Sequence, residues 1–144
     1  RDMKDYMAEA LKQAKTAFSI GEVPIGAVIV KDGNIISSSH NLCQEKKDST
    51  MHAEMNVIKD AMAKLGDKVL ENCDLYVTVE PCPMCAGALA WSQTGKVVDG
   101  AEDPKRGFSN FLPSLMHPKT EVVSGVLADE CGDLVTGFLW NKRK

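Results

Sequence analysis

The chain has 144 residues, of which 44% are hydrophobic and 26% are charged, and its formal net charge is -3. This length predicts a single domain over residues 1–144 with a substantial core. No apolar run approaches the roughly 18 residues that a membrane-spanning helix needs, so we expect a soluble protein with no membrane partner. The negative net charge argues against a broadly basic surface of the kind that phosphate-binding proteins usually carry.

The cysteines point to a reducing environment. There are five, an odd number, and Cys82 and Cys85 form a C-x-x-C pair, which is typical of reduced thiols or a metal site rather than a disulfide framework. The charged, amphipathic start of the chain lacks the basic stub and apolar block of a secretory signal, so we expect a cytoplasmic location. Residues 141–144, NKRK, form the one dense basic cluster, which fits a solvated helix end or a phosphate contact.

The predicted elements of the first half begin with a helix. Apolar residues at three- and four-residue steps predict this helix over 3–18, and the GEVP segment ends it. Two β-branched runs on either side of Asp32 and Gly33 predict an antiparallel hairpin, because this dipeptide tolerates positive φ in a tight turn. Helical periodicity then predicts a second helix over 52–65 that stops at Gly66.

The second half continues the alternation of strands and helices. In order, the predicted elements are a strand at 74–80, a helix of small residues at 82–91, strands at 97–101 and 121–127, and a helix at 128–141. This order requires crossover connections and therefore some parallel pairing. The sequence thus predicts an α/β fold: a three-layer α/β/α sandwich around a mixed sheet of about five strands. We expect the site where strands end and helices begin.

Two motifs with metal-ligating side chains fall at predicted helix starts. Cys82 and Cys85 are three residues apart on one helix face, so both sulfurs can reach one point, and the helix dipole there favours thiolates. His52 is the one histidine at a predicted helix start. Two thiolates and one imidazole leave a fourth position for water, as catalytic zinc sites do. Zn²⁺ suits this ligand set best, although iron or cobalt can also use it.

Glu54, two residues after His52, makes hydrolysis the favoured chemistry. A carboxyl group beside an activated water can take its proton and pass it to a leaving nitrogen. Separately, the H-x-E motif fits ordinary helix capping, and C-x-x-C fits a redox pair, half a zinc knuckle or the core. Occurring together at two helix starts, they favour one catalytic site. A structural zinc would need a fourth closely spaced ligand, and the remaining cysteines form no second C-x-x-C.

The HAE and PCPMC segments resemble the zinc-dependent cytidine deaminase superfamily, whose signature is H-x-E followed by P-C-x-x-C. The segments GEVPIGAVIV, LYVTVEPCPMCAGAL, GAEDPK and GVLADEC are similar to those of bacterial tRNA adenosine deaminases over nearly the whole chain. The resemblance implies a cytidine deaminase-like fold, His52, Cys82 and Cys85 as ligands, and Glu54 as the proton shuttle. It also implies a homodimer whose subunits complete each other's pockets.

The same resemblance implies substrate contacts at Asn41, Ala53 and Asp103. Considered without it, Asn41 fits a turn as well as a base contact, and Asp103, which precedes a proline, favours a turn. Trp91 is expected in the core or at a subunit interface rather than stacked on substrate. Phe108, Phe111 and Leu112 are expected to cover the bound base, to anchor a loop in the core, or to do both, with the core role first.

The chain departs from the tRNA enzymes at three places. Gln93 stands where they carry arginine, Asp99 stands where they carry an aromatic residue, and the loop over 108–120 is shorter. Three functions therefore stay open. The first is hydrolytic deamination of adenosine to inosine in a tRNA anticodon loop, favoured by the overall resemblance. The second is deamination of a free base or nucleoside (cytosine, guanine, cytidine or adenosine), favoured by the net charge and these departures. The third is a non-catalytic zinc-stabilised interaction module, against which Glu54 argues.

Overall fold

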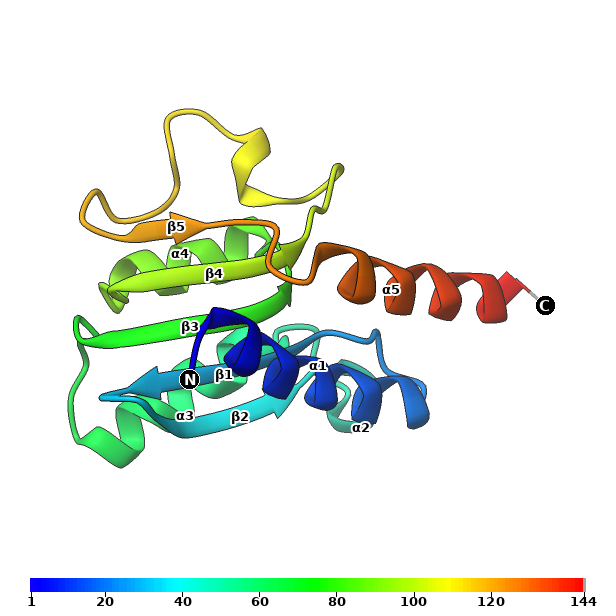
Figure 1. Cartoon of the computed structure of the whole chain (residues 1–144), viewed down its shortest axis with the longest axis horizontal. Coiled ribbons are helices and arrows are strands. Elements are labelled where there is room, and N and C mark those ends of the chain that lie inside the picture. Colours follow the sequence, from blue (N-terminus) through cyan, green and yellow to red (C-terminus); the bar gives the residue numbers. More distant parts are fainter. Residues whose placement is uncertain (144) are drawn as a thin grey trace.

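The computed structural model describes residues 1–143 and arranges five strands into one mixed sheet between two helical layers (Figure 1). The strand order is β2-β1-β3-β4-β5. Strand β1 pairs antiparallel with both β2 and β3, whereas β3 with β4 and β4 with β5 are parallel. The bounds are β1 Gly26–Lys31, β2 Asn34–His40, β3 Cys73–Val79, β4 Lys96–Ala101 and β5 Glu121–Val123. The predicted fold class is confirmed.

The helices cover both faces of the sheet. They are α1 Met3–Ser19, α2 Cys43–Lys46, α3 Ala53–Leu65, α4 Pro83–Trp91 and α5 Ala128–Arg143. Helices α3 and α4 pack on one face and α1 and α5 on the other, so the core has two parts. Neighbouring strand residues enter opposite parts: Val97 belongs to the first and Val98 to the second. This alternation is the two-residue period of a strand buried on both sides.

Local signals in the sequence account for the ends of several elements. Asp2 caps α1 through a reciprocal capping box with Asp5. The hairpin turns at Asp32 and Gly33, which have φ of 50° and 76°. Gly66 ends α3 in the left-handed conformation, with φ of 64°.

The structure adds one element that was not expected, corrects the end of one strand, and excludes one of the two alternatives for Trp91. Helix α2 has four residues and was not expected. Strand β5 ends at Val123 rather than at residue 127, because Gly125 and Leu127 have φ of 87° and 55°, which a strand cannot accommodate. Trp91 is 88% exposed in this chain, so it does not belong to the core.

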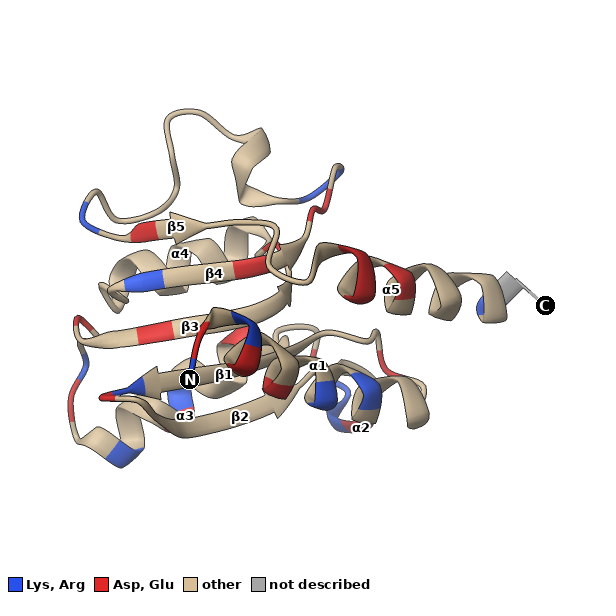
Figure 2. Ribbon diagram, viewed as in Figure 1, with Lys and Arg blue, Asp and Glu red and all other residues tan. Residues whose placement is uncertain are grey.

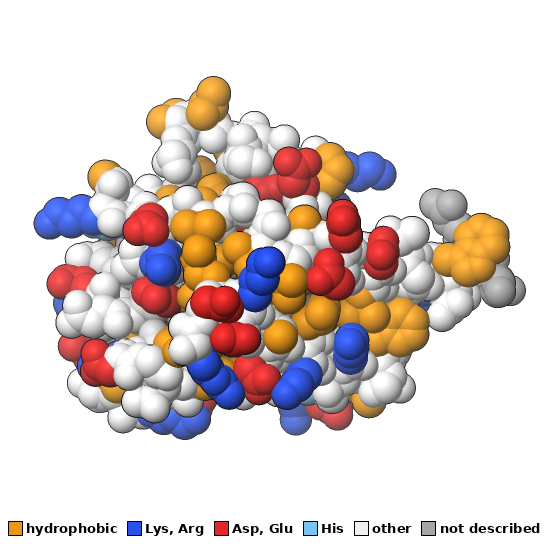
Figure 3. All heavy atoms as spheres, in the orientation of Figure 1, with side chains coloured by type: hydrophobic (Ala, Val, Ile, Leu, Met, Phe, Trp, Pro, Cys, Tyr) orange, Lys and Arg blue, Asp and Glu red, His pale blue; other side chains and the backbone are white. Residues whose placement is uncertain are grey.

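The charged and apolar side chains are distributed as the composition of the chain leads one to expect. Figure 2 shows Lys and Arg spread over helices, strands and loops with Asp and Glu between them. Figure 3 shows one face of the molecule, where charged side chains of both signs alternate with apolar ones. None of the helices within residues 1–143 combines the length and hydropathy needed to span a bilayer.

Candidate active site

His52, Cys82 and Cys85 come together where α3 and α4 begin. His52 occupies the N-cap position of α3 and Cys82 that of α4, which opens with Pro83, and neither side chain makes a capping hydrogen bond. The His52 Nδ1 atom lies 3.6 Å from Cys82 Sγ and 3.5 Å from Cys85 Sγ. One donor atom from each residue lies within 4.8 Å of the others. The two motifs, 30 residues apart in sequence, therefore form one cluster.

The protonation states of the cluster fit a cation. A hydrogen bond from the Cys85 thiol lowers the pKa of Cys82 to about 4, and the same bond, with burial, raises the pKa of Cys85. The hydrogen bond to Cys82 also raises the pKa of His52. The three side chains thus share protons that a bound metal would replace. One imidazole and two thiols are a donor set that suits Zn²⁺, so the residues present fit this metal; that they hold it stays a prediction.

Glu54 lies in the first turn of α3 and is 3% exposed. Its Oε1 atom is buried and has no hydrogen-bond partner among the described residues. Burial raises the pKa of Glu54 to about 7. A buried carboxylate oxygen without a partner is rare in a folded protein and needs a reason. Proton transfer near neutral pH is such a reason, because the carboxyl group must be able to accept a proton and to return it.

Asn41 and Ala53 are joined by a hydrogen bond. The Asn41 Oδ1 atom accepts from the Ala53 backbone N–H at 2.8 Å, and both residues are buried. Asn41 therefore satisfies one of the N–H groups that the start of α3 leaves unpaired. Its side-chain NH₂ group can still donate to a base. The expected contacts of both residues with substrate stay predictions.

Asp103 forms a turn in the structure. Its Oδ1 atom accepts from the backbone N–H groups of Lys105 at 3.2 Å and Arg106 at 3.0 Å. This is the turn that an aspartate before a proline favours. Asp103 is not among the residues that line the cavity beside the cluster, and its predicted contact with substrate stays untested.

A cavity of about 480 Å³ opens beside the cluster. It is lined by Ser49, His52, Cys82, Pro83, Met84, Lys105, Arg106 and Phe111. Three of these residues had no role assigned from the sequence: Met84 lies within the PCPMC segment but carries no ligand atom of the expected kind, and no regular spacing links Lys105 or Arg106 to the motifs. The expected core role is confirmed for Phe108, which is buried, whereas Phe111 is 43% exposed and lines the cavity, and Leu112 is 91% exposed. That these side chains cover a base stays a prediction.

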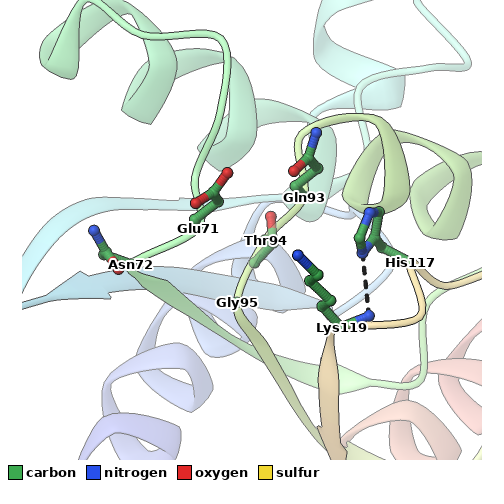
Figure 4. Close-up of a pocket in the computed structure, with 7 residues that line it drawn as sticks. All are labelled: Glu71, Asn72, Gln93, Thr94, Gly95, His117 and Lys119. Atoms are coloured by element: carbon green, nitrogen blue, oxygen red, sulfur yellow. Dashed lines mark hydrogen bonds between the residues drawn. The ribbon is translucent and has the colours of Figure 1, made fainter.

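A second cavity, of about 280 Å³, lies at the opposite end of the sheet, where β3 and β4 start. Figure 4 shows its polar lining, which includes Gln93, His117 and Lys119, and the bond from the Lys119 N–H to His117 Nδ1 at 3.1 Å. Gln93, one of the departures from the tRNA enzymes, therefore lies away from the His52 cluster. Its identity does not affect the chemistry of that cluster directly.

The comparisons with known proteins agree with this geometry. The family model described as the cytidine and deoxycytidylate deaminase zinc-binding region matches residues 1–101. The chain belongs to this family. Its fold and its H-x-E and P-C-x-x-C motifs are those that the family resemblance implied.

Three known proteins show in more detail what the chain is similar to. The chain is 51% identical to a tRNA-specific adenosine deaminase of Bacillus subtilis over 96% of this chain and 89% of that protein. It also matches a solved structure from work on A-to-I editing by tRNA:A34 deaminases at the wobble position of transfer RNA, with 40% identity, a TM-score of 0.85, and coverage of 90% and 98%. A guanine deaminase structure from Bacillus subtilis matches with 38% identity and a TM-score of 0.68, over 71% of this chain and 66% of that one.

Proposed function

We propose that this protein is a zinc-dependent hydrolase that deaminates adenosine to inosine in the anticodon loop of a tRNA. The observation that carries the proposal is the cluster of His52, Cys82 and Cys85 with Glu54 in the turn next to it, a buried residue whose Oε1 atom has no hydrogen-bond partner among the described residues. The tRNA-specific adenosine deaminase that is 51% identical over nearly the full chain supports the choice of substrate.

The chemistry divides between the metal and the side chains of this chain. His52, Cys82 and Cys85 would hold Zn²⁺, which when bound lowers the pKa of a water molecule to about 7. Glu54 accepts a proton from the water and passes it to the exocyclic nitrogen of the base. The water oxygen bonds to the ring carbon, the carbon–nitrogen bond breaks, and ammonia leaves. Asn41 donates its amide to the base and so orients it.

The side chains that line the cavity beside His52 favour a nucleotide over a free base as the substrate. Met84 and Phe111 give the cavity apolar side chains that can contact a base, while Lys105 and Arg106 bring two positive charges. Phosphates beside a target nucleotide would pair with these cations. A free base carries no phosphate, so it would make no such contact with Lys105 and Arg106.

Deamination of a free base such as guanine is the second candidate. The guanine deaminase structure with 38% identity favours it, and so do the net charge of -3 and the presence of Asp99 in place of an aromatic residue. The cations at the cavity favour the tRNA reading over this one.

We also propose a domain organisation, an oligomeric state and a location for the protein. Residues 1–144 form one domain, and two copies form a homodimer through the face that includes α4, where Trp91 is exposed. The dimer acts in the cytoplasm. The high exposure of a tryptophan supports the dimer, because exposed aromatic side chains are enriched at interfaces.

The test is ammonia release by the zinc-loaded protein. The substrates are an anticodon stem-loop with adenosine at the target position, the same stem-loop with guanosine there, and free adenosine, cytidine, cytosine and guanine. We expect release from the adenosine stem-loop alone. Release from guanine alone would favour the second candidate, and release from none would contradict both.

Glu54→Ala is the matched variant for this assay. We expect at least a roughly 10²-fold lower kcat with unchanged zinc content, because the substitution removes the proton shuttle and leaves the ligands. Loss of zinc in Glu54→Ala would show that Glu54 holds the metal site together instead.

A further inference from the structure

Glu80 is a buried carboxylate that the proposed chemistry does not use. It follows the last residue of β3 and precedes Pro81 and Cys82, and it is 7% exposed. Charged carboxylates are rarely buried unless they are paired or accept several hydrogen bonds. The contacts of Glu80 therefore indicate why a charge is kept at this point of the chain.

Both carboxylate oxygens of Glu80 accept from backbone N–H groups of the same distant loop. The Oε1 atom accepts from Asp103 at 3.1 Å, and the Oε2 atom accepts from Ser109 at 2.8 Å. Beside them, the Phe108 N–H donates to the Pro81 carbonyl at 2.9 Å. Residues 103–109 are thus fastened at both ends to the two residues that precede Cys82.

The loop is also moulded around the carboxylate. A Cβ atom added to Gly107 would lie 2.2 Å from Glu80 Oε1 and 2.3 Å from its Cδ, so any larger residue here would force the Glu80 carboxylate out of its place. The φ of Gly107 is -63°, which every residue adopts. Glycine is needed here for the close approach to Glu80 and not for its backbone conformation.

The same loop carries three side chains of the cavity beside the His52 cluster. Lys105 and Arg106 line it, and the turn formed by Asp103 holds their N–H groups. Phe111, two residues beyond the fastened segment, also lines it and donates its N–H to the Phe108 carbonyl at 3.1 Å. The position of the loop relative to Cys82 therefore decides where these groups meet a substrate.

We propose that Glu80 is a positioning residue, whose carboxylate fixes the loop so that Lys105, Arg106 and Phe111 contact the nucleotide bound beside the metal cluster. This proposal rests on the proposed function. Only a carboxylate offers an acceptor to each of the two N–H groups, because a glutamine would turn an NH₂ donor toward one of them. Hydrogen bonds to a charged acceptor are also the stronger kind.

The first test is Glu80→Gln in the zinc-loaded protein. We expect KM for the adenosine stem-loop to rise at least about tenfold while kcat changes less than about threefold, because the loop binds parts of the substrate remote from the reacting carbon. Zinc content stays the same. Amide hydrogen exchange at Asp103 and Ser109 becomes at least about tenfold faster.

Two further variants keep the test decisive. Gly107→Ala disturbs the same contact from the loop side, and we expect it to raise KM in the same way, including if Glu80→Gln folds poorly. Asp60→Asn is the control, because Asp60 on α3 is also a carboxylate that accepts a hydrogen bond, from Ser37 at 2.7 Å, but lies outside this cavity. It should leave KM and the exchange of the two amides unchanged.

Unchanged KM and unchanged exchange in Glu80→Gln would overturn the proposal, and so would a lower melting temperature with unchanged KM. Loss of zinc with lower kcat would assign Glu80 to the metal ligands instead. If the wild-type protein does not deaminate the adenosine stem-loop, the proposed function is wrong. Amide exchange at Asp103 and Ser109 in Glu80→Gln then still shows whether Glu80 holds the loop.

Discussion

Asp99 on β4 is a carboxylate in an unfavourable place. It is 2% exposed, and burial, with the nearby charges of Glu80 and Glu102, raises its pKa to about 6 against a hydrogen bond from Ser124 that lowers it. The folded protein therefore holds this proton more tightly than the unfolded chain. The resulting stabilisation is present below the ordinary pKa of 3.8 and is lost as the pH rises through about 6.

Asp99→Asn should remove this dependence, because asparagine fills the same space without a charge. We expect the variant to be more stable than the wild type at pH 8, with an advantage that shrinks by about 1 kcal/mol at pH 5. Urea unfolding of the zinc-loaded proteins at the two pH values measures the difference. Asp133→Asn, at an exposed position on α5, is the control. An advantage of equal size at both pH values would contradict the assignment.

The sequence could identify some site residues but not others. The metal-cluster residues and Glu54 belong to two short motifs whose residue types and positions at helix starts are recognisable in the sequence, although only the fold brings His52 to the two cysteines. Glu80 gives no such signal, because its partners lie 23 and 29 residues further along the chain. The cavity residues Lys105 and Arg106 were missed for a related reason, since only the folded loop brings them beside His52.

Helix α1 approaches β1 very closely, and Gly26 permits it. A Cβ atom at this position would lie 2.1 Å from the Ala10 carbonyl oxygen and 2.4 Å from the Ala14 backbone nitrogen. Both alanines are fully buried. The small residues on the two elements set the distance between this helix and the sheet.

Gly26→Ala should therefore force α1 away from the sheet. We expect it to destabilise the protein by about 3 kcal/mol or more, because the obstructing atoms are backbone and cannot rotate away. Thermal and urea unfolding provide the measurement. Gly132→Ala on α5 is the matched control: its added Cβ would meet Ala101 Cβ at 3.7 Å, an ordinary contact, and alanine favours a helix by about 0.5–1 kcal/mol. Equal stability of the two variants would contradict this account of the packing.

Long helices and strands could be predicted from the sequence more fully than short ones. The long helices α1, α3 and α5 show clear apolar periods, and the Asp32–Gly33 hairpin has a specific turn signal. The four residues of α2 are too few for any period, and Glu22, whose carboxylate accepts from the N–H groups of Gln44 and Glu45, braces it from a distant segment. Strand β5 could not be bounded because its end depends on local φ values.

The whole molecule leaves a large aromatic side chain uncovered. Trp91 at the end of α4 is 88% exposed, and Met84 in the first turn is 36% exposed. Together with the family resemblance, this predicts that α4 contributes to the contact between two copies.

Trp91→Glu should weaken that dimer. We expect its dissociation constant to rise at least about 30-fold, because a buried interface tryptophan is typically worth 2 kcal/mol or more. Sedimentation equilibrium measures the change. Ile20→Glu, at a position 50% exposed after α1 and so on the other helical layer, is the control that should not alter it. A wild-type protein that is monomeric at micromolar concentration would contradict the dimer itself.

The two outer strands of the sheet protect the molecule from another kind of association. At one edge β5 has only three residues. At the other edge, the pairing of β2 with β1 shifts between Ile29 and Val30 of β1, so that Ile36 of β2 is an extra residue. The Lys64 ammonium donates a hydrogen bond to the Ile36 carbonyl at 2.9 Å. A short edge, and an edge interrupted by a bulge and a lysine, both resist pairing with strands of other molecules. Chains crowded together should therefore resist amyloid-like growth.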